Sequence, residues 1–204
     1  ISTDPNYTNG CPYSGNYPHG LIVPVSGDIT TYNCRDGDVF LSGTLKGNMS
    51  IASEHDINIT WNLQYGTGGT TGTGNLLGLV ANNYVSVFHP VDDDGDNLNI
   101  PGHSTPFNNA TIQAAILSVQ HSFRVQNFDD GSPLGNLNIT GAIAQEYRGA
   151  VGTFSGTSSV SGYTKNYVYD TRLKYLSPPY FLDPVKSAWG VATWAEIHTP
   201  GTFP

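Results

Sequence analysis

Three blocks of nine residues in this chain share one pattern of apolar and polar positions. They are IASEHDINI from Ile51, LVANNYVSV from Leu79 and LSVQHSFRV from Leu117. Each block begins with an aliphatic residue, continues through a small and polar middle, and ends with an apolar, polar, apolar triplet. The block starts are 28 residues (51 to 79) and 38 residues (79 to 117) apart. Loose periods of about 20–50 residues are typical of solenoids and other repeat arrays.

An alternation of period two continues beyond each triplet, as in Ile57, Ile59, Trp61 and Leu63. The ranges 39–45, 85–91 and 137–143 follow the same rule. This period indicates strands with one buried face. Polar columns also recur when the blocks are aligned, which predicts that like groups stack and exchange hydrogen bonds at a shared corner. The fourth column is Glu54, Asn82 and Gln120, and the fifth is His55, Asn83 and His121.

We therefore expect an all-β, single-domain parallel β-solenoid with irregular coils over residues 37–162. Each coil of such a fold buries its apolar side against the next coil. Residues 66–75, 91–108 and 127–135 would be loops. The alternative is a β-sandwich, because an antiparallel sandwich also has short alternating strands between turns. A sandwich, however, does not require the same polar columns to recur.

Both ends of the single domain 1–204 are expected to be caps. Residues 1–36 would form an N-terminal cap, and a disulfide between Cys11 and Cys34, the only two cysteines, would tie it down. Two unrelated thiols are the alternative, since two cysteines alone do not decide their pairing. Residues 163–204 are rich in aromatic residues and proline and would form a C-terminal cap over the open end of the solenoid.

Charge and composition exclude some partners. The chain has 8 Lys and Arg against 16 Asp and Glu, a formal net charge of -8, so we expect no nucleic-acid partner. No apolar run approaches the roughly 20 residues that span a bilayer, so we expect no membrane span. The chain begins at Ile1, which fits a processed or trimmed fragment from which any targeting segment has been removed. N-glycosylation sequons, weak signals in an Asn-rich and Thr-rich chain, begin at Asn6, Asn48, Asn58, Asn109 and Asn138.

An acidic loop is the candidate metal site. Asp92, Asp94 and Asp96 alternate in the stretch VDDDGDN, and alternating carboxylates in a loop are how Ca²⁺ gathers oxygen ligands. The loop is not an EF-hand, because its glycine falls too early and His103 stands where the bidentate Glu would be. Calcium is thus the one candidate cofactor, and a solvated acidic turn without a metal is the alternative.

Four segments resemble a group of exported, type IV pilus-associated bacterial surface proteins, often actinobacterial, with a β-solenoid body. They are LVANNYVSVFHPV, AAILSVQHSFRVQNF, NITGAIAQEYRGAVGTF and KNYVYDTRLKYLSPPYFLDPV, and the resemblance covers most of the chain from about Val39 onward. It implies an extracellular or cell-surface location and a solenoid architecture. It implies no catalytic residues, and the chain lacks the hydrophobic pilin helix that such proteins usually have at the N-terminus.

We expect from this an extracellular structural or adhesive protein, associated with a pilus or filament. Its partners would be other subunits of the filament or a polysaccharide, which aromatic side chains can stack against. The alternative is a carbohydrate-active β-helix enzyme, a polysaccharide lyase or hydrolase. A hydrolase of this kind would need two carboxylates about 5–10 Å apart. No nucleophile elbow or phosphate-binding loop appears in the sequence, so we assign no catalytic residue and favour the non-enzymatic function.

Overall fold

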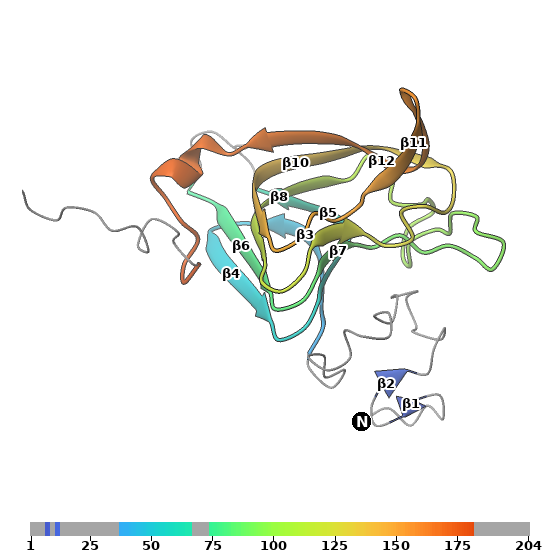
Figure 1. Ribbon diagram of the computed structural model, residues 1–204. Coiled ribbons are helices and arrows are strands. Elements are labelled where there is room, and N and C mark those ends of the chain that lie inside the picture. Colours follow the sequence, from blue (N-terminus) through green and yellow to red (C-terminus); the bar gives the residue numbers. More distant parts are fainter. Residues whose placement is uncertain (1–6, 9–10, 13–36, 67–73, 182–204) are drawn as a thin grey trace, which may run out of the picture.

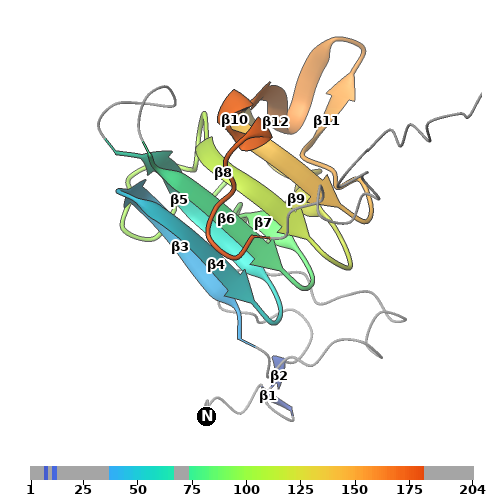
Figure 2. The ribbon, with the colours of Figure 1, turned by 90° about the vertical axis from the view of Figure 1, so that its left-hand side faces the viewer.

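Most strands belong to a single sheet that curls on itself (Figure 1; Figure 2). Their alternating apolar residues face the interior that this sheet encloses. The structure is a computed structural model, and it describes residues 7–8, 11–12, 37–66 and 74–181. The buried aliphatic and aromatic side chains of these residues form one continuous core. The described residues contain no α-helix, in keeping with the absence of helical periodicity from the sequence.

Ten strands make up the main sheet, and two short strands form a separate antiparallel pair. The short pair is β1 (Tyr7–Thr8) and β2 (Cys11–Pro12). The main strands are β3 (Val39–Leu45), β4 (Asn48–Ser53), β5 (Ile57–Tyr65), β6 (Leu76–Ala81), β7 (Val85–Val87), β8 (Thr111–Ser118), β9 (Phe123–Val125), β10 (Pro133–Gln145), β11 (Gly152–Ser155) and β12 (Ser158–Tyr169). A 3-10 turn, η2 (Thr171–Lys174), follows β12.

The main sheet consists of two parallel runs that meet. One run pairs β3, β5, β7 and β9 in that order, and the other pairs β4, β6, β8, β10 and β12. Leu63 on β5 pairs with Ile112 on β8 and joins the runs. Only β11 is antiparallel, to β12. The all-β and parallel predictions are confirmed, in the form of a nearly closed, mostly parallel, barrel-like sheet. The described residues do not form an antiparallel sandwich.

The repeated triplets pair in register, as the sequence predicts. Ile57 lies beside Val85, and Val85 lies beside Phe123, on the adjoining parallel strands β5, β7 and β9. All three side chains are buried. Like positions of successive blocks are therefore neighbours in the core, where each strand removes the apolar surface of the next from water.

The first residues of the blocks pair as predicted between the first and second blocks, but not between the second and third. Ile51 lies beside Leu79 as predicted, but the partner of Leu79 on β8 is Ile116, and Leu117 pairs with Val80 instead. The predicted alignment of the third block is wrong by one residue at its start, because the corner after β8 contains one residue more than the corner after β6. A one-residue offset turns a side chain to the other face of a strand, which explains why Ile116 is buried and Leu117 is only partly buried.

The polar columns form in part at these corners. The Gln120 side-chain amide donates to Asn82 Oδ1 at 3.3 Å, as the fourth column predicts. In the fifth column Asn83 Nδ2 lies 3.2 Å from His55 Nε2. The predicted place of His121 in that column is wrong, because its ring stacks on the ring of Tyr84 with centroids 4.5 Å apart. The corner that contains His121 is one residue longer than the corner that contains Asn83, so the two residues need not occupy equivalent places.

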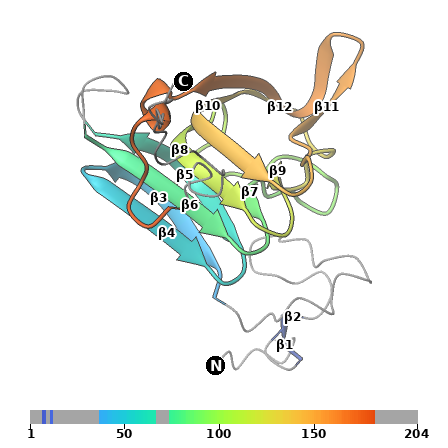
Figure 3. The ribbon, with the colours of Figure 1, turned by 60° about the vertical axis from the view of Figure 1, so that its left-hand side comes forward.

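The C-terminal segment extends the sheet before it crosses it. β12 is a further parallel strand beside β10, and Tyr163 within it is fully buried. After η2 the chain turns back over the outer face of β4 and β6, where Ser50 Oγ donates to the carbonyl oxygen of Pro179 (Figure 3). Gly78 permits this crossing, since a Cβ there would lie 2.6 Å from the Phe181 ring and 3.0 Å from Pro178.

Most of the described aromatic residues assigned to the C-terminal cap are not buried. Tyr167, Tyr169, Tyr175 and Tyr180 are 40, 49, 88 and 102% exposed. Within the described residues, therefore, these tyrosines do not seal the end of the sheet formed by β12 as a cap would. The side chains of β12 face solvent there, and this end contains the candidate site.

Candidate functional site

The inner face of β12 differs in chemistry from that of the strand beside it. Lys165 pairs with Leu137 and Tyr167 with Ile139 in the register of β10 and β12. Side chains of paired residues in parallel strands point to the same face of the sheet. Leu137 and Ile139 are buried in the core, whereas Lys165 and Tyr167 belong to the last strand of the run and are exposed. The end of the sheet thus presents a cation and a phenol where the interior has aliphatic groups.

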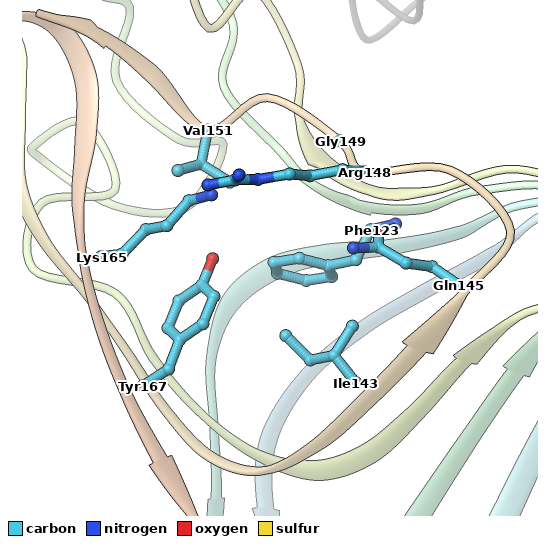
Figure 4. A pocket seen from close by; sticks show the side chains of 8 residues that line it. All are labelled: Phe123, Ile143, Gln145, Arg148, Gly149, Val151, Lys165 and Tyr167. Carbon is cyan, nitrogen blue, oxygen red and sulfur yellow. Dashed lines mark hydrogen bonds between the residues drawn. The ribbon is translucent and has the colours of Figure 1, made fainter.

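A pocket of about 480 Å³ opens at this end of the sheet (Figure 4). Its walls come from the start of β9, the end of β10, the connection from β10 to β11, and the middle of β12. The lining residues are Phe123, Ile143, Gln145, Arg148, Gly149, Val151, Lys165 and Tyr167. In Figure 4, Phe123 and Ile143 form an apolar floor. The two cationic side chains and Val151 lie on the opposite side, so the pocket combines apolar surface with polar groups that can bind a ligand, as is usual for a ligand site.

Backbone contacts hold the connection from β10 to β11 against the third block. Val125 N donates to the carbonyl oxygen of Ala150 at 3.0 Å, and Tyr147 N donates to that of His121 at 3.1 Å. Gly149 comes so close to the chain that a Cβ there would lie 2.0 Å from the Phe123 carbonyl oxygen. This close approach is possible only for glycine. The pocket wall that includes Arg148 is therefore fixed on both sides of that residue.

The pocket is positively charged. Figure 4 shows the Arg148 and Lys165 side chains reaching toward each other above the Tyr167 hydroxyl. Desolvation lowers the pKa of Lys165, and the nearby charge of Arg148 lowers it further. The Lys165 ammonium also lies 5.9 Å from the centre of the Tyr167 ring. None of the described residues that line the pocket is a carboxylate, so these walls contain no negative charge that compensates the two cations.

Tyr167 remains protonated at ordinary pH. Although the side chain as a whole is 40% exposed, partial burial in the pocket raises the pKa of Tyr167 to about 12, and the charge of Arg148 opposes that increase. The hydroxyl can therefore donate a hydrogen bond into the pocket as well as accept one. Gln145 adds an amide that is held in place, because its Oε1 accepts from Phe123 N at 2.8 Å. Together these groups can bind an anion or a hydroxyl-rich molecule.

A second polar cluster lies at the corner between β4 and β5. Among the described residues, Asp38, His55 and Asp56 form the only group of three or more His, Cys, Asp or Glu whose potential ligand atoms lie within 4.8 Å of one another. The Asp38 carboxylate contacts His55 Nδ1, and Asp56 Oδ1 is 3.8 Å from His55 Nε2. The donor set would suit a divalent transition metal.

Hydrogen bonds within the protein account for this cluster without a ligand. Asp38 Oδ1 accepts from Asp56 N at 3.1 Å, and Asp56 Oδ1 accepts from Tyr84 N at 2.9 Å. His55 and Asp56 are 3% and 4% exposed, so solvent hardly reaches them. Burial raises the pKa of Asp56, against the lowering effect of His55. We interpret the cluster as a structural connection between successive corners.

The predicted calcium ligands lie on a turn of their own. Asp92 Oδ1 accepts from Asp94 N at 3.1 Å and from Asp96 N at 2.7 Å. This carboxylate therefore stabilises the turn through its own backbone. The three carboxylates are not among the grouped ligand sets of the described residues. Calcium binding at Asp92, Asp94 and Asp96 stays a prediction.

Two other predictions concern covalent modification. The disulfide between Cys11 and Cys34 lies outside the described residues, since Cys34 is not described and only the backbone of Cys11 is. Of the sequon residues, Asn58 is fully buried on β5, so glycosylation there is incompatible with the folded chain. Asn48 and Asn109 are exposed.

Sequence reasoning missed the pocket, although a signal for it was present. Lys165, Tyr167 and Tyr169 alternate as KNYVY in a strand, and the preceding strand has Leu137 and Ile139 in the same columns. A switch from aliphatic to basic and aromatic residues in an inward column indicates the last strand of a stack. Arg148 carries no comparable signal, because its position depends on the path of a connection.

Comparisons of the chain with family models, with curated proteins and with solved structures give no significant match. Within the described ranges, no helix has the length and apolar character needed to cross a lipid bilayer.

Proposed function

We propose that this chain is an extracellular, surface-associated adhesive protein that binds a polysaccharide at the open end of its sheet. In this proposal the sheet is the body of a short, irregular β-solenoid, and the stacked columns from Ile57 to Phe123 support that architecture. The single observation on which the function depends is the pocket in which Tyr167, Lys165 and Arg148 converge over an apolar floor.

Sugar binding fits the residues at this end of the sheet. Tyr167 and Tyr169 lie on the same face of β12, about 6.6 Å apart along the strand. Both rings are partly exposed. Tyrosine offers a large apolar ring face and a hydroxyl, and it loses little conformational entropy on binding. A polymer that follows β12 would meet one ring after the other, and the pocket would take one of its groups.

The alternative of a polysaccharide-cleaving enzyme has less support. A hydrolase would need a pair of carboxylates in its cleft, and none lines the pocket. Asp56, which lies near a repeat corner, is buried in hydrogen bonds with its neighbours. We therefore propose binding without cleavage.

A panel of immobilised neutral and acidic glycans tests the proposal, with retained protein and released reducing ends measured in the same samples. We expect retention without release. Tyr167→Ala should weaken retention strongly, while Tyr180→Ala, which alters a fully exposed tyrosine outside the pocket, should leave it unchanged. Release of reducing ends would favour the enzyme. If no glycan is retained, the proposed polysaccharide function is wrong.

A further inference from the structure

The pocket is basic although the chain as a whole is acidic. The chain has 8 Lys and Arg against 16 Asp and Glu, and Arg148 and Lys165 both line this one pocket. A protein with a net charge of -8 repels anions overall. A local pair of cations facing one cavity is therefore a specific feature that non-specific attraction does not explain.

Other arginines in the described residues have partners within the protein. Arg172 forms an ion pair with Asp170, with Nη2 and Oδ2 2.6 Å apart. The Arg124 guanidinium lies 3.7 Å from the centre of the Tyr84 ring, and its Nε donates to Ser86 Oγ at 3.3 Å. Arg148 and Lys165 make no ion pair with a described carboxylate. Their position beside each other is electrostatically unfavourable until an anion binds between them.

We infer that the pocket binds the anionic group of an acidic polysaccharide, a carboxylate or a sulfate on a sugar, between Arg148 and Lys165. This inference rests on the proposed function and names the class of its ligand. Arginine binds carboxylate and sulfate oxygens through two parallel hydrogen bonds, and lysine adds a point charge. The Tyr167 hydroxyl supplies a further donor. The rings of Tyr167 and Tyr169 then stack against the neighbouring sugars.

An anion in this position would also offset the repulsion between Arg148 and Lys165. The pKa of Lys165 is lowered by desolvation and by Arg148, and a bound negative charge acts in the opposite direction on that pKa. Binding should therefore weaken as salt concentration rises, because the charges lie at an opening to solvent where ions screen them.

The test compares polymers that share one sugar backbone and differ in whether that backbone carries anionic groups, with the full chain in each assay. Polygalacturonate is paired with its fully methyl-esterified form, and dextran sulfate is paired with dextran. We expect each acidic polymer that binds to do so about tenfold or more tightly than its neutral counterpart. Lys165→Gln and Arg148→Gln should each remove most of this preference, whereas Lys174→Gln, on η2 outside the pocket, should keep it. Urea unfolding confirms that each variant is folded.

The outcomes separate this inference from the proposed function. Equal affinity for neutral and acidic polymers overturns the inference and leaves polysaccharide binding intact. Equal losses in Lys174→Gln and Lys165→Gln also overturn it, because they would indicate diffuse attraction. Absence of binding to every polymer overturns the proposed function itself. A preference for only one acidic pair identifies the anion as carboxylate or sulfate and supports the inference.

Discussion

The side-chain amide of Gln126 donates a hydrogen bond to Asn58 Oδ1 at 3.0 Å across 68 residues of chain. Both side chains are fully buried. Asn58 lies on β5 and Gln126 directly follows β9, so the bond connects the first repeated block to the residue that follows the third block, across β7. Asn58 Nδ2 and Gln126 Oε1 have no partner among the described residues. This bond is therefore what compensates the burial of both amides.

Removing one partner of this bond should destabilise the fold. In Gln126→Met the Asn58 amide is left buried with no side-chain partner, and the free energy of unfolding should fall by about 1–3 kcal/mol. In the double variant Asn58→Leu/Gln126→Met neither group needs a partner, so its loss should be smaller than the sum of the two single losses. Urea unfolding of the native chain, of the single variants Asn58→Leu and Gln126→Met, and of the double variant measures these losses. Additive losses would show that the two amides are not coupled.

The column of Ile57, Val85 and Phe123 predicts that a substitution within it destabilises the fold more than one at an exposed corner. Ile57 is 0% exposed between its neighbours in the parallel strands, and Ile57→Ala should lower the free energy of unfolding by about 2–5 kcal/mol. Val119 lies in the corner after β8 and is 44% exposed, so Val119→Ala should change it by at most about 0.5 kcal/mol. Denaturant unfolding of both variants checks this. Similar losses in both would mean that the column does not form the core.

The sequence predicts the strands and their stacking because both depend on local alternation. Ile57, Val85 and Phe123 occupy equivalent places in their blocks, and burial of one face is enough to bring them into register. The sequence does not predict that Leu79 pairs with Ile116, because the additional corner residue after β8 does not change the alternation of apolar and polar positions. Insertions in a turn cost little, so the chain tolerates them without any compensating signal.

The site is harder to predict than the strands. Lys165 and Tyr167 follow the alternation, but their role depends on β12 being the last strand of its run, which is a property of the whole fold. Arg148 and Gly149 reach the pocket through a connection whose path is determined by backbone contacts to Phe123 and its neighbours. Contacts of this kind join residues far apart in sequence and have no local pattern.

Calcium at the acidic loop is tested by thermal unfolding with calcium and with EDTA. If Asp92, Asp94 and Asp96 hold the ion, calcium should raise the melting temperature because the ion binds only the folded chain. The double variant Asp94→Asn/Asp96→Asn should lose that difference. Asp92 is left unchanged, since its carboxylate also accepts two backbone hydrogen bonds of the turn. Equal melting temperatures in calcium and EDTA would exclude the site.

The buried carboxyl of Asp56 should make stability depend on pH. Burial is the main cause that raises the pKa of Asp56 above its ordinary value of 3.8, and Asp38 also raises it, whereas His55 and Arg124 lower it. As pH rises from about that value, the unfolded chain releases this proton first and the folded chain retains it. The folded state therefore loses stability across this window, until the pH exceeds the raised pKa.

Asp56→Asn isolates this effect, because an amide does not titrate and its oxygen can still accept from Tyr84 N, as Asp56 Oδ1 does at 2.9 Å. The free energy of unfolding of the variant, minus that of the native chain, should increase as pH rises from about 4 to 7. The other carboxyls are common to both proteins, so most of their pH dependence cancels in the difference. Urea unfolding at successive pH values measures it. A difference that stays constant or falls with pH would contradict the raised pKa.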